Sequence, residues 1–333
     1  MPLLSVSNLA VEFETAEGAV KAVNGMTFDI HEGETLAIVG ESGSGKSQLV
    51  LSFMGLLAEN GSVSGEARFR GEDLLQMKPK ELNRIRGRHI AMIFQDPMTS
   101  LNPFLSIEKQ MMEVVMHHQG LRRDEARAHA VEMLRAVRIP DPEERIKQYP
   151  HEYSGGMRQR VMIAIGLLCA PDLLIADEPS TALDVTVQAQ ITELVSELRK
   201  KTKMSLVLIT HDLSAVAEIA DRIIVMYAGE AVETGTVDEI FYSPQHPYTR
   251  GLIASVPRLD RVSDDELHAI PGNPPNLLAL PLGCSFRDRC TEAKEQCFER
   301  PPLWRGESGR TSRCIQGVEG GELVTESPAG GEG

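Results

Sequence analysis

The sequence lacks several features that define whole classes of protein. No apolar run is long enough to cross a membrane: residues 163–176 are the most apolar, but Pro171 and Asp172 interrupt them, and a spanning helix needs about 20 residues. Basic charge is not in excess, since 34 Lys and Arg stand against 48 Asp and Glu for a net charge of −14. Proteins that hold nucleic acid through charge usually need a basic face, so we expect no nucleic-acid partner. The N-terminus also lacks the basic start and apolar run of a signal peptide, which predicts a cytoplasmic chain.

Cysteine is scarce, but its few copies are unevenly placed. The chain of 333 residues has five cysteines, of which Cys169 stands alone and four crowd the last fifty residues, namely Cys284, Cys290, Cys297 and Cys314. In a reducing compartment such a cluster suggests a metal site ahead of disulfides. The spacings C-x5-C, C-x6-C and C-x16-C differ from the C-x2-C pairs of zinc ribbons. Four thiolates suffice for zinc or for an iron–sulfur cluster, and free or oxidised thiols are the third alternative.

Apolar periodicity predicts an α/β fold followed by an irregular region. Residues 4–30 alternate apolar and polar side chains, which is typical of half-buried antiparallel strands. The other predicted elements are buried strands at 35–40, 90–94, 173–177 and 205–210, helices at 46–57, 106–138 and 187–198, and a hairpin at 222–235. Proline and glycine become dense after residue 242, so we expect an α/β domain over 1–242, a loop-rich domain with the four cysteines over 243–316, and a flexible tail over 317–333.

One glycine-rich segment predicts a nucleotide site. GESGSGKS (Gly40–Ser47) fits the phosphate-loop pattern G-x-x-x-x-G-K-[ST] and lies between a predicted strand and a predicted helix. Successive backbone N–H groups can wrap a phosphate there, and the helix N-terminus adds roughly half a positive charge. Lys46 would reach the β- and γ-phosphates, and the Ser47 hydroxyl would ligate Mg²⁺. The predicted nucleotide-binding residues are Gly40, Ser42, Gly43, Ser44, Gly45, Lys46 and Ser47.

LLIADEP (Leu173–Pro179) supplies acidic groups for the same site. A carboxylate at the end of a buried strand beside a phosphate loop can hold Mg²⁺ and its water shell, which predicts a metal-binding role for Asp177. Glu178 would then orient or deprotonate the attacking water. Adjacent acids at a strand end are often only part of a solvated loop, but their pairing with a phosphate loop favours catalysis.

YSGGMRQR (Tyr153–Arg160), shortly before the LLIAD strand, resembles the signature of the ABC-type ATPases. The resemblance covers residues 4 to about 242 and implies a RecA-like core, an antiparallel β subdomain and a helical signature subdomain. In that family two nucleotide domains face each other. Ser154, Gly155 and Gly156 would therefore grip the γ-phosphate of ATP bound to the facing domain. Met157 stands where the family usually has glutamine.

The same resemblance assigns roles to four further positions. Gln95, in FQDPMTSLNP, looks like the Q-loop glutamine that senses Mg²⁺ and the γ-phosphate. His211, in LITHD, looks like the switch histidine, and Asp184, in STALD, looks like the D-loop aspartate. Phe13 is a candidate for the aromatic side chain that stacks on adenine, although a strand residue that faces the core is the simpler alternative. The predicted catalytic residues are thus Glu178, His211 and Gln95, and the predicted Mg²⁺ ligands are Ser47, Gln95 and Asp177.

The two ends of the chain narrow the resemblance to the D-type ATPase subunits of oligopeptide and dipeptide permeases. The residues that carry it are MIFQDPMTSLNP, YPHEYSGGMRQRVMIA, SPQHPYT and IPGNPPNLLALPLGCSFRDRC. The resemblance implies an ATP-driven importer for oligopeptides. A dipeptide or nickel importer of the same subfamily is an alternative, and a soluble ABC ATPase that acts on DNA or ribosomes is a rival from another class.

The resemblance also implies partners and a cofactor. The partners are two membrane permease subunits, an extracytoplasmic peptide-binding protein and a second, F-type ATPase that completes a heterodimer. The chain would then lie peripherally on the cytoplasmic face of the inner membrane. A [4Fe–4S] cluster is implied at Cys284, Cys290, Cys297 and Cys314, because related ATPases hold one at matching cysteines.

Overall fold

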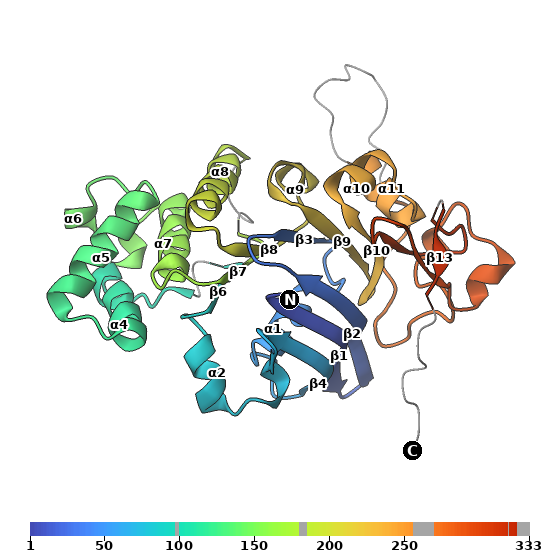
Figure 1. The fold of residues 1–333 in the computed structure, drawn as a ribbon, viewed down its shortest axis with the longest axis horizontal. Helices are drawn as coiled ribbons and strands as arrows, with labels where there is room; N and C mark the ends of the chain where they lie inside the picture. The colour runs from blue at the N-terminus through green and yellow to red at the C-terminus, as the bar shows by residue number, and fades with distance from the viewer. Residues whose placement is uncertain (97–99, 180–184, 256–269, 319, 325–333) are drawn as a thin grey trace.

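Two β-sheets and the helix between them form the centre of the protein (Figure 1). The computed structural model describes residues 1–96, 100–179, 185–255, 270–318 and 320–324. The larger sheet has nine strands in the order β13-β11-β12-β10-β9-β3-β8-β7-β6. Its strands are β3 (Thr35–Val39), β6 (Ile90–Ile93), β7 (Leu173–Asp177), β8 (Ser205–Thr210), β9 (Arg222–Tyr227), β10 (Glu230–Thr236), β11 (Leu303–Arg305), β12 (Thr311–Arg313) and β13 (Glu322–Leu323).

The parallel centre of this sheet is buried on both faces. Strands β6, β7, β8, β3 and β9 run parallel to one another. Because successive side chains point to opposite faces, alternate residues enter different cores. Leu36 and Ile38 belong to one buried cluster, whereas Ala37 and Val39 belong to the other. The sheet is therefore covered on both sides, as the continuous apolar runs in these strands predict.

Four antiparallel strands form the smaller sheet, in the order β2-β1-β4-β5. They are β1 (Leu4–Thr15), β2 (Gly18–Ile30), β4 (Gly61–Phe69) and β5 (Glu72–Asp73). Helix α1 (Lys46–Phe53) packs between the two sheets, since its Leu49, Val50 and Phe53 join a cluster with residues of both. The antiparallel sheet predicted from the alternation over residues 4–30 is confirmed.

Helices α4 to α7 form a separate helical region at one end of the molecule (Figure 1). Residues 106–138, predicted to be helical, form two helices, because Gly120 ends the first in a left-handed conformation at φ 69°. The helices of the protein are α2 (Pro79–Ile85), α4 (Ile107–Gln119), α5 (Arg123–Ala136), α6 (Pro142–Arg145), α7 (Gly155–Leu167), α8 (Val185–Thr202), α9 (Leu213–Ile219), α10 (Val237–Tyr242) and α11 (Pro247–Ala254). Short 3₁₀ turns are η1 (Leu74–Gln76), η2 (Pro150–Glu152), η3 (Arg287–Arg289) and η4 (Glu295–Phe298).

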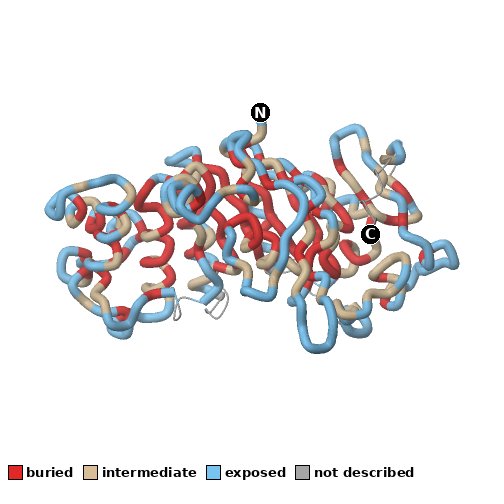
Figure 2. Tube along the Cα trace, turned by 90° about the horizontal axis from the view of Figure 1, so that it is seen from below, coloured by how far each residue is buried: buried red, intermediate tan, exposed pale blue. Residues whose placement is uncertain are grey.

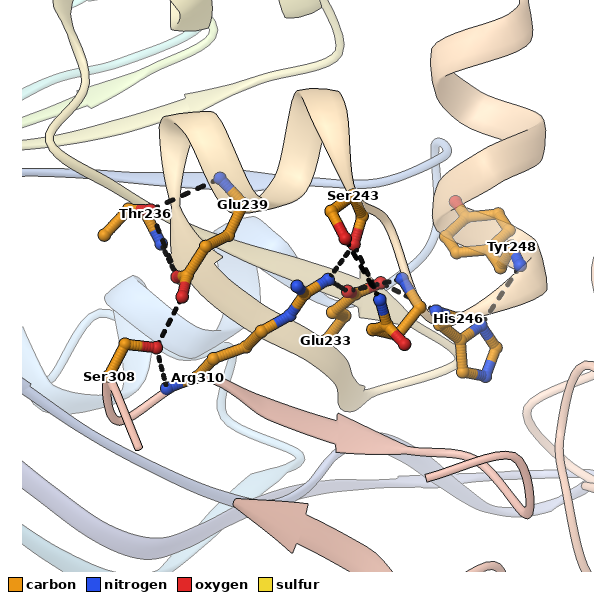
Figure 3. Close-up of polar contacts among 9 residues, drawn as sticks. Glu233, Thr236, Glu239, Ser243, His246, Tyr248, Ser308 and Arg310 are labelled. Carbon is orange, nitrogen blue, oxygen red and sulfur yellow. Dashed lines mark hydrogen bonds and ion pairs between the residues drawn. The ribbon is translucent and has the colours of Figure 1, made fainter. Parts of the chain in front are cut away.

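The C-terminal region, which we define as residues 243–324, extends the large sheet. Strand β12 pairs with β10, and β11 connects β12 to β13. A buried network fastens this region to β10 (Figure 3): the Glu233 carboxylate, fully buried, accepts hydrogen bonds from Arg310 and from the backbone N–H groups of Gln245 and His246. In the described part of this region loops connect short elements, among them β11, β12 and β13, and β13 lies in the segment predicted to be a flexible tail.

Buried segments run through all parts of the molecule (Figure 2). They include the faces of α4, α5 and α7, the parallel strands, and positions near Phe286 in the C-terminal region. Within the described ranges, no helix is both long enough and apolar enough to cross a membrane.

Candidate functional site

The phosphate loop connects the end of β3 to the start of α1 and lies closely against neighbouring backbone. Gly45 has a φ of 96°, a conformation that favours glycine, and a Cβ there would lie 2.1 Å from the carbonyl oxygen of Ala22. A Cβ at Gly40 would lie 2.2 Å from the carbonyl oxygen of Met226. Both glycines of the pattern are therefore required sterically, whatever the ligand.

Lys46 is folded back into the loop. Its Nζ donates to the carbonyl oxygens of Gly40 at 2.8 Å and Glu41 at 2.9 Å, and the residue is 5% exposed. Burial lowers the pKa of Lys46, while the nearby carboxylates of Glu178 and Asp177 oppose that shift. The ammonium group thus lies among the groups that would meet a phosphate.

Ser47 and Asp177 meet as predicted from the two separate motifs. The Ser47 hydroxyl donates to Asp177 Oδ1 at 2.9 Å. Asp177 is buried at the carboxyl end of β7, and this desolvation raises the pKa of Asp177, with the Ser47 hydrogen bond acting against it. A hydroxyl and a carboxylate are the oxygen donors that Mg²⁺ prefers, so these two residues fit that ion.

Glu178 lies at the centre of a second polar group. Its Oε2 accepts a hydrogen bond from Gln95 Nε2 at 3.0 Å and lies 3.5 Å from His211 Nδ1. Its backbone has a φ of 46°, which is unusual for a residue with a side chain, and its N–H donates to the carbonyl oxygen of Ile209 at 2.8 Å. The structure therefore brings the three predicted catalytic residues together.

Residues of the phosphate loop and the polar group around Glu178 line one cleft of about 770 Å³. Phe13 lies at its wall, half-buried, beside the phosphate loop. The cleft is lined by Phe13, Val20, Ala22, Ser42, Gly43, Ser44, Gly45, Lys46, Ser47, Gln48, Gln95, Glu178, His211 and Leu277. The lining includes four residues that the sequence motifs did not single out, Val20, Ala22, Gln48 and Leu277. Val20 could have been found, because it pairs with Phe13 across the β1–β2 hairpin, but no sequence signal marks Leu277.

The signature residues lie outside this cleft. Ser154 caps α7, where its side chain accepts a hydrogen bond from the Met157 N–H at 3.3 Å. Ser154 and Gly155 are exposed at the helix N-terminus, and Gly156 follows them. Asp184, the predicted D-loop aspartate, lies outside the described residues.

The predicted iron–sulfur cluster is wrong. The four cysteines do share one cavity, but its volume is about 20 Å³, which is room for roughly one water molecule. Among the residues that the structure describes, no group of three or more His, Cys, Asp or Glu side chains could hold a metal ion. Burial raises the pKa of Cys284 to about 11 and also raises the pKa values of Cys290 and Cys314, which favours protonated thiols. The spacing correctly grouped the cysteines but carries no information on the space between them.

Two family profiles match the chain. The profile described as "ABC transporter" matches residues 23–181, and "Oligopeptide/dipeptide transporter, C-terminal region" matches residues 232–297. The first spans the phosphate loop, the signature and the β7 acids.

Relatives match nearly the whole chain. The oligopeptide transport ATP-binding protein OppD of Salmonella typhimurium is 54% identical over 317 residues, which cover 95% of this chain and 94% of that protein. The dipeptide transport ATP-binding protein DppD of Bacillus subtilis is 54% identical over 297 residues, covering 89% and 88%. Among solved structures, the dimeric post-hydrolysis ATP-binding cassette MJ0796, bound to ADP and Pi, matches with a TM-score of 0.64 and 26% identity over 70% of this chain and 98% of that one.

The comparisons also correct one predicted partner. The expectation of a heterodimer with a second, F-type ATPase is wrong. The solved cassette that this chain resembles is a dimer of one cassette, and the relatives are named as ATP-binding proteins of peptide transport.

Proposed function

Because the chain belongs to the ABC transporter family of ATP-binding proteins, we propose that it is the ATPase motor of an oligopeptide importer. The observation that carries this proposal is the cleft in which Lys46, Ser47 and Glu178 converge, with Asp177 hydrogen-bonded to Ser47. Similarity along nearly the whole chain to an oligopeptide transport ATP-binding protein supports the substrate class. Dipeptides are the second candidate, because the dipeptide relative is equally identical over a slightly shorter alignment.

ATP binding relies on the phosphate loop and its charged neighbours. The backbone N–H groups of Gly40 to Ser47 surround the phosphates, and the Lys46 ammonium turns from the loop carbonyls to the β- and γ-phosphates. Ser47, Asp177 and Gln95 would hold Mg²⁺, which would neutralise charge on the phosphates. Phe13 stacks on the base. Support for this arrangement comes from the 2.9 Å contact between Ser47 and Asp177 and from the place of Phe13 on the cleft wall.

Hydrolysis relies on the group around Glu178. Its carboxylate, held by Gln95 and close to His211, orients the attacking water and draws a proton from it. His211 and Gln95 contact the γ-phosphate and so couple its presence to the conformation of the rest of the molecule.

Coupling to transport requires further subunits. The signature residues Ser154, Gly155 and Gly156, of which the first two are exposed, complete the ATP site of a second copy, and Asp184 acts across the same interface. The closed dimer then moves two membrane permease subunits, to which an extracytoplasmic binding protein delivers the peptide. The chain would thus work as a peripheral subunit at the inner membrane, without a nucleic-acid partner.

Two variants test the nucleotide assignment. Lys46→Ala should abolish binding of a fluorescent ATP analogue, because it removes the cation inside the loop. Glu178→Gln should keep nucleotide binding but lower ATP turnover by a factor of about 100 or more, since general-base catalysis is lost. Lys109→Ala, at an exposed position on α4, is the control. Unchanged binding in Lys46→Ala, or undiminished turnover in Glu178→Gln, would refute the assignment.

A further experiment tests the substrate. Deletion of the gene should abolish uptake of labelled tri- to pentapeptides, and the Glu178→Gln gene should fail to restore it. Loss of dipeptide uptake alone would select the second candidate, and normal uptake of every peptide would overturn the importer proposal.

A further inference from the structure

Glu41, the second residue of the phosphate loop, forms a bidentate ion pair with Arg289 of the C-terminal region. Arg289 Nη1 donates to Glu41 Oε2 at 2.6 Å, and Nη2 donates to Oε1 at 2.9 Å. The Arg289 side chain is 6% exposed and that of Glu41 27%, so water screens the pair only weakly. The pair raises the pKa of Arg289, with the Glu41 hydrogen bonds as the main cause. This is the geometry in which arginine and carboxylate bind most strongly.

The backbone of Glu41 is held as well. Its N–H donates to the Tyr248 hydroxyl at 2.9 Å, and Tyr248 belongs to α11 of the C-terminal region. Its carbonyl oxygen accepts the hydrogen bond from Lys46 Nζ. Glu41 therefore connects the C-terminal region directly to the lysine that faces the phosphates.

Arg289 is itself fixed in place. Its Nε donates to the carbonyl oxygen of Pro271 at 2.8 Å, and its Nη1 donates to the Tyr227 hydroxyl at 3.3 Å. Both partners are outside the phosphate loop, one in the C-terminal region and one at the end of β9. Arg289 thus offers Glu41 a rigid anchor rather than a mobile surface charge.

The same segment of the C-terminal region also covers the loop. Pro274, Pro275 and Leu277 enclose a small cavity of about 10 Å³ together with residues 41–44. Leu277 additionally lines the nucleotide cleft. This segment therefore does more than attach the C-terminal region to the core, because it also reaches the nucleotide cleft.

We propose that Arg289 is a positioning residue for ATP, which holds the phosphate loop in its binding conformation through Glu41. The C-terminal region thereby sets the affinity of the ATP site, to which it also contributes Leu277. The loop needs this support because its glycines leave the backbone freer than that of other residues. The proposal rests on the proposed nucleotide function of the cleft.

A double-mutant cycle tests the proposal on the full-length chain. Arg289→Met and Glu41→Gln should each raise both the Kd of a fluorescent ATP analogue and the KM for ATP by about tenfold, with kcat at saturating ATP changed less than about twofold. The double variant should show the same tenfold effect rather than a hundredfold one, because the two residues act as a unit. Arg289→Lys keeps the charge but loses the bidentate contact, so the affinity of this variant for the ATP analogue should be intermediate.

Controls separate this idea from simple stabilisation and from the proposed function. Arg300→Met removes an ion pair to Glu230 at 3.3 Å, in which the arginine is 58% exposed, and should leave both constants unchanged. Unchanged KM and Kd in Arg289→Met, or a loss of kcat alone through a smaller folded fraction, would overturn the positioning role. If Arg289→Met fails to fold, Arg289→Lys and Glu41→Gln decide the question by the same constants. Nucleotide binding that survives Lys46→Ala would instead refute the cleft as the ATP site.

Discussion

At the residue scale, Glu178 shows local strain at the position where catalysis is proposed. Its φ of 46° is a left-handed conformation that costs a residue with a side chain about 1–2 kcal/mol. The strand β7 ends immediately before it, and the hydrogen bond from its N–H to Ile209 keeps the backbone in this conformation. In this conformation the carboxylate contacts Gln95 and lies close to His211.

This strain predicts a trade-off between stability and activity. Glu178→Gly and Glu178→Gln both remove the carboxylate, so both should abolish ATP turnover. Only glycine relieves the left-handed conformation, so the glycine variant should be more stable than the glutamine variant by about 1 kcal/mol. Urea denaturation of the two proteins measures the difference. A glycine variant that is less stable than the glutamine variant would show that the backbone is not strained there.

A second prediction concerns the buried pair of Glu233 and Arg310 (Figure 3). Glu233 is fully buried and Arg310 nearly so. Removing only one member of such a pair leaves the other charge without its counterion, so Arg310→Met should cost about 3 kcal/mol of unfolding free energy. The measurement is urea denaturation monitored by circular dichroism. Arg305→Met, at an exposed position on β11, should leave the midpoint unchanged, and equal midpoints for both variants would contradict the prediction.

At the element scale, the N-terminus of α11 carries a pH-dependent contribution to stability. His246 caps this helix, with its Nδ1 accepting the Tyr248 N–H at 3.1 Å. Burial, assisted by the positive charge of Arg250, lowers the pKa of His246 to about 3. In the unfolded chain the histidine has its ordinary pKa of about 6.5. The unfolded state therefore takes up the proton first, and stability is lost as the pH falls below about 6.5.

Substitution by asparagine isolates this effect. His246→Asn keeps an acceptor for the Tyr248 N–H but has no titratable group. Between pH 7 and pH 5.5 the unmodified protein should lose about 1 kcal/mol more stability than the asparagine variant. Each pH unit over which the unfolded state binds one more proton than the folded state changes the free energy of unfolding by about 1.4 kcal/mol. Chemical denaturation at several pH values measures both curves. Parallel curves would mean that His246 is not held neutral in the folded protein.

The elements also show what the sequence could predict. Short-range patterns were sufficient to predict features whose signal is local. Alternation over residues 4–30 predicts antiparallel strands, and two motifs with known spacing predict that Ser47 and Asp177 lie together. The ion pair of Glu41 and Arg289 has no local signal, because it depends on how the C-terminal region folds back onto the large sheet. The cysteine cluster failed for a related reason: spacing groups thiols, but packing sets the cavity between them.

At the scale of the whole molecule, the two halves of the proposed chemistry lie in different places. The phosphate loop and Glu178 line one cleft, whereas Ser154 and Gly155 are exposed at the start of α7. Helix α7 belongs to the helical region at one end of the molecule (Figure 1). One chain therefore does not bring its own signature into its own cleft. Under the proposed function a second copy would supply it; a solved cassette to which this chain is similar is dimeric.

This separation predicts ATP-dependent association. Glu178→Gln should bind ATP without hydrolysing it, and the retained γ-phosphate should hold two copies together. Light scattering coupled to size exclusion should then report a dimer with ATP and Mg²⁺, and a monomer without nucleotide or with ADP. Adding Gly155→Asp supplies the control: an acidic residue in the first turn suits the helix N-terminus and preserves the fold, but it repels the γ-phosphate of the facing copy. The double variant should bind ATP and stay monomeric. If Glu178→Gln also stays monomeric while it binds ATP, the second copy does not complete the site.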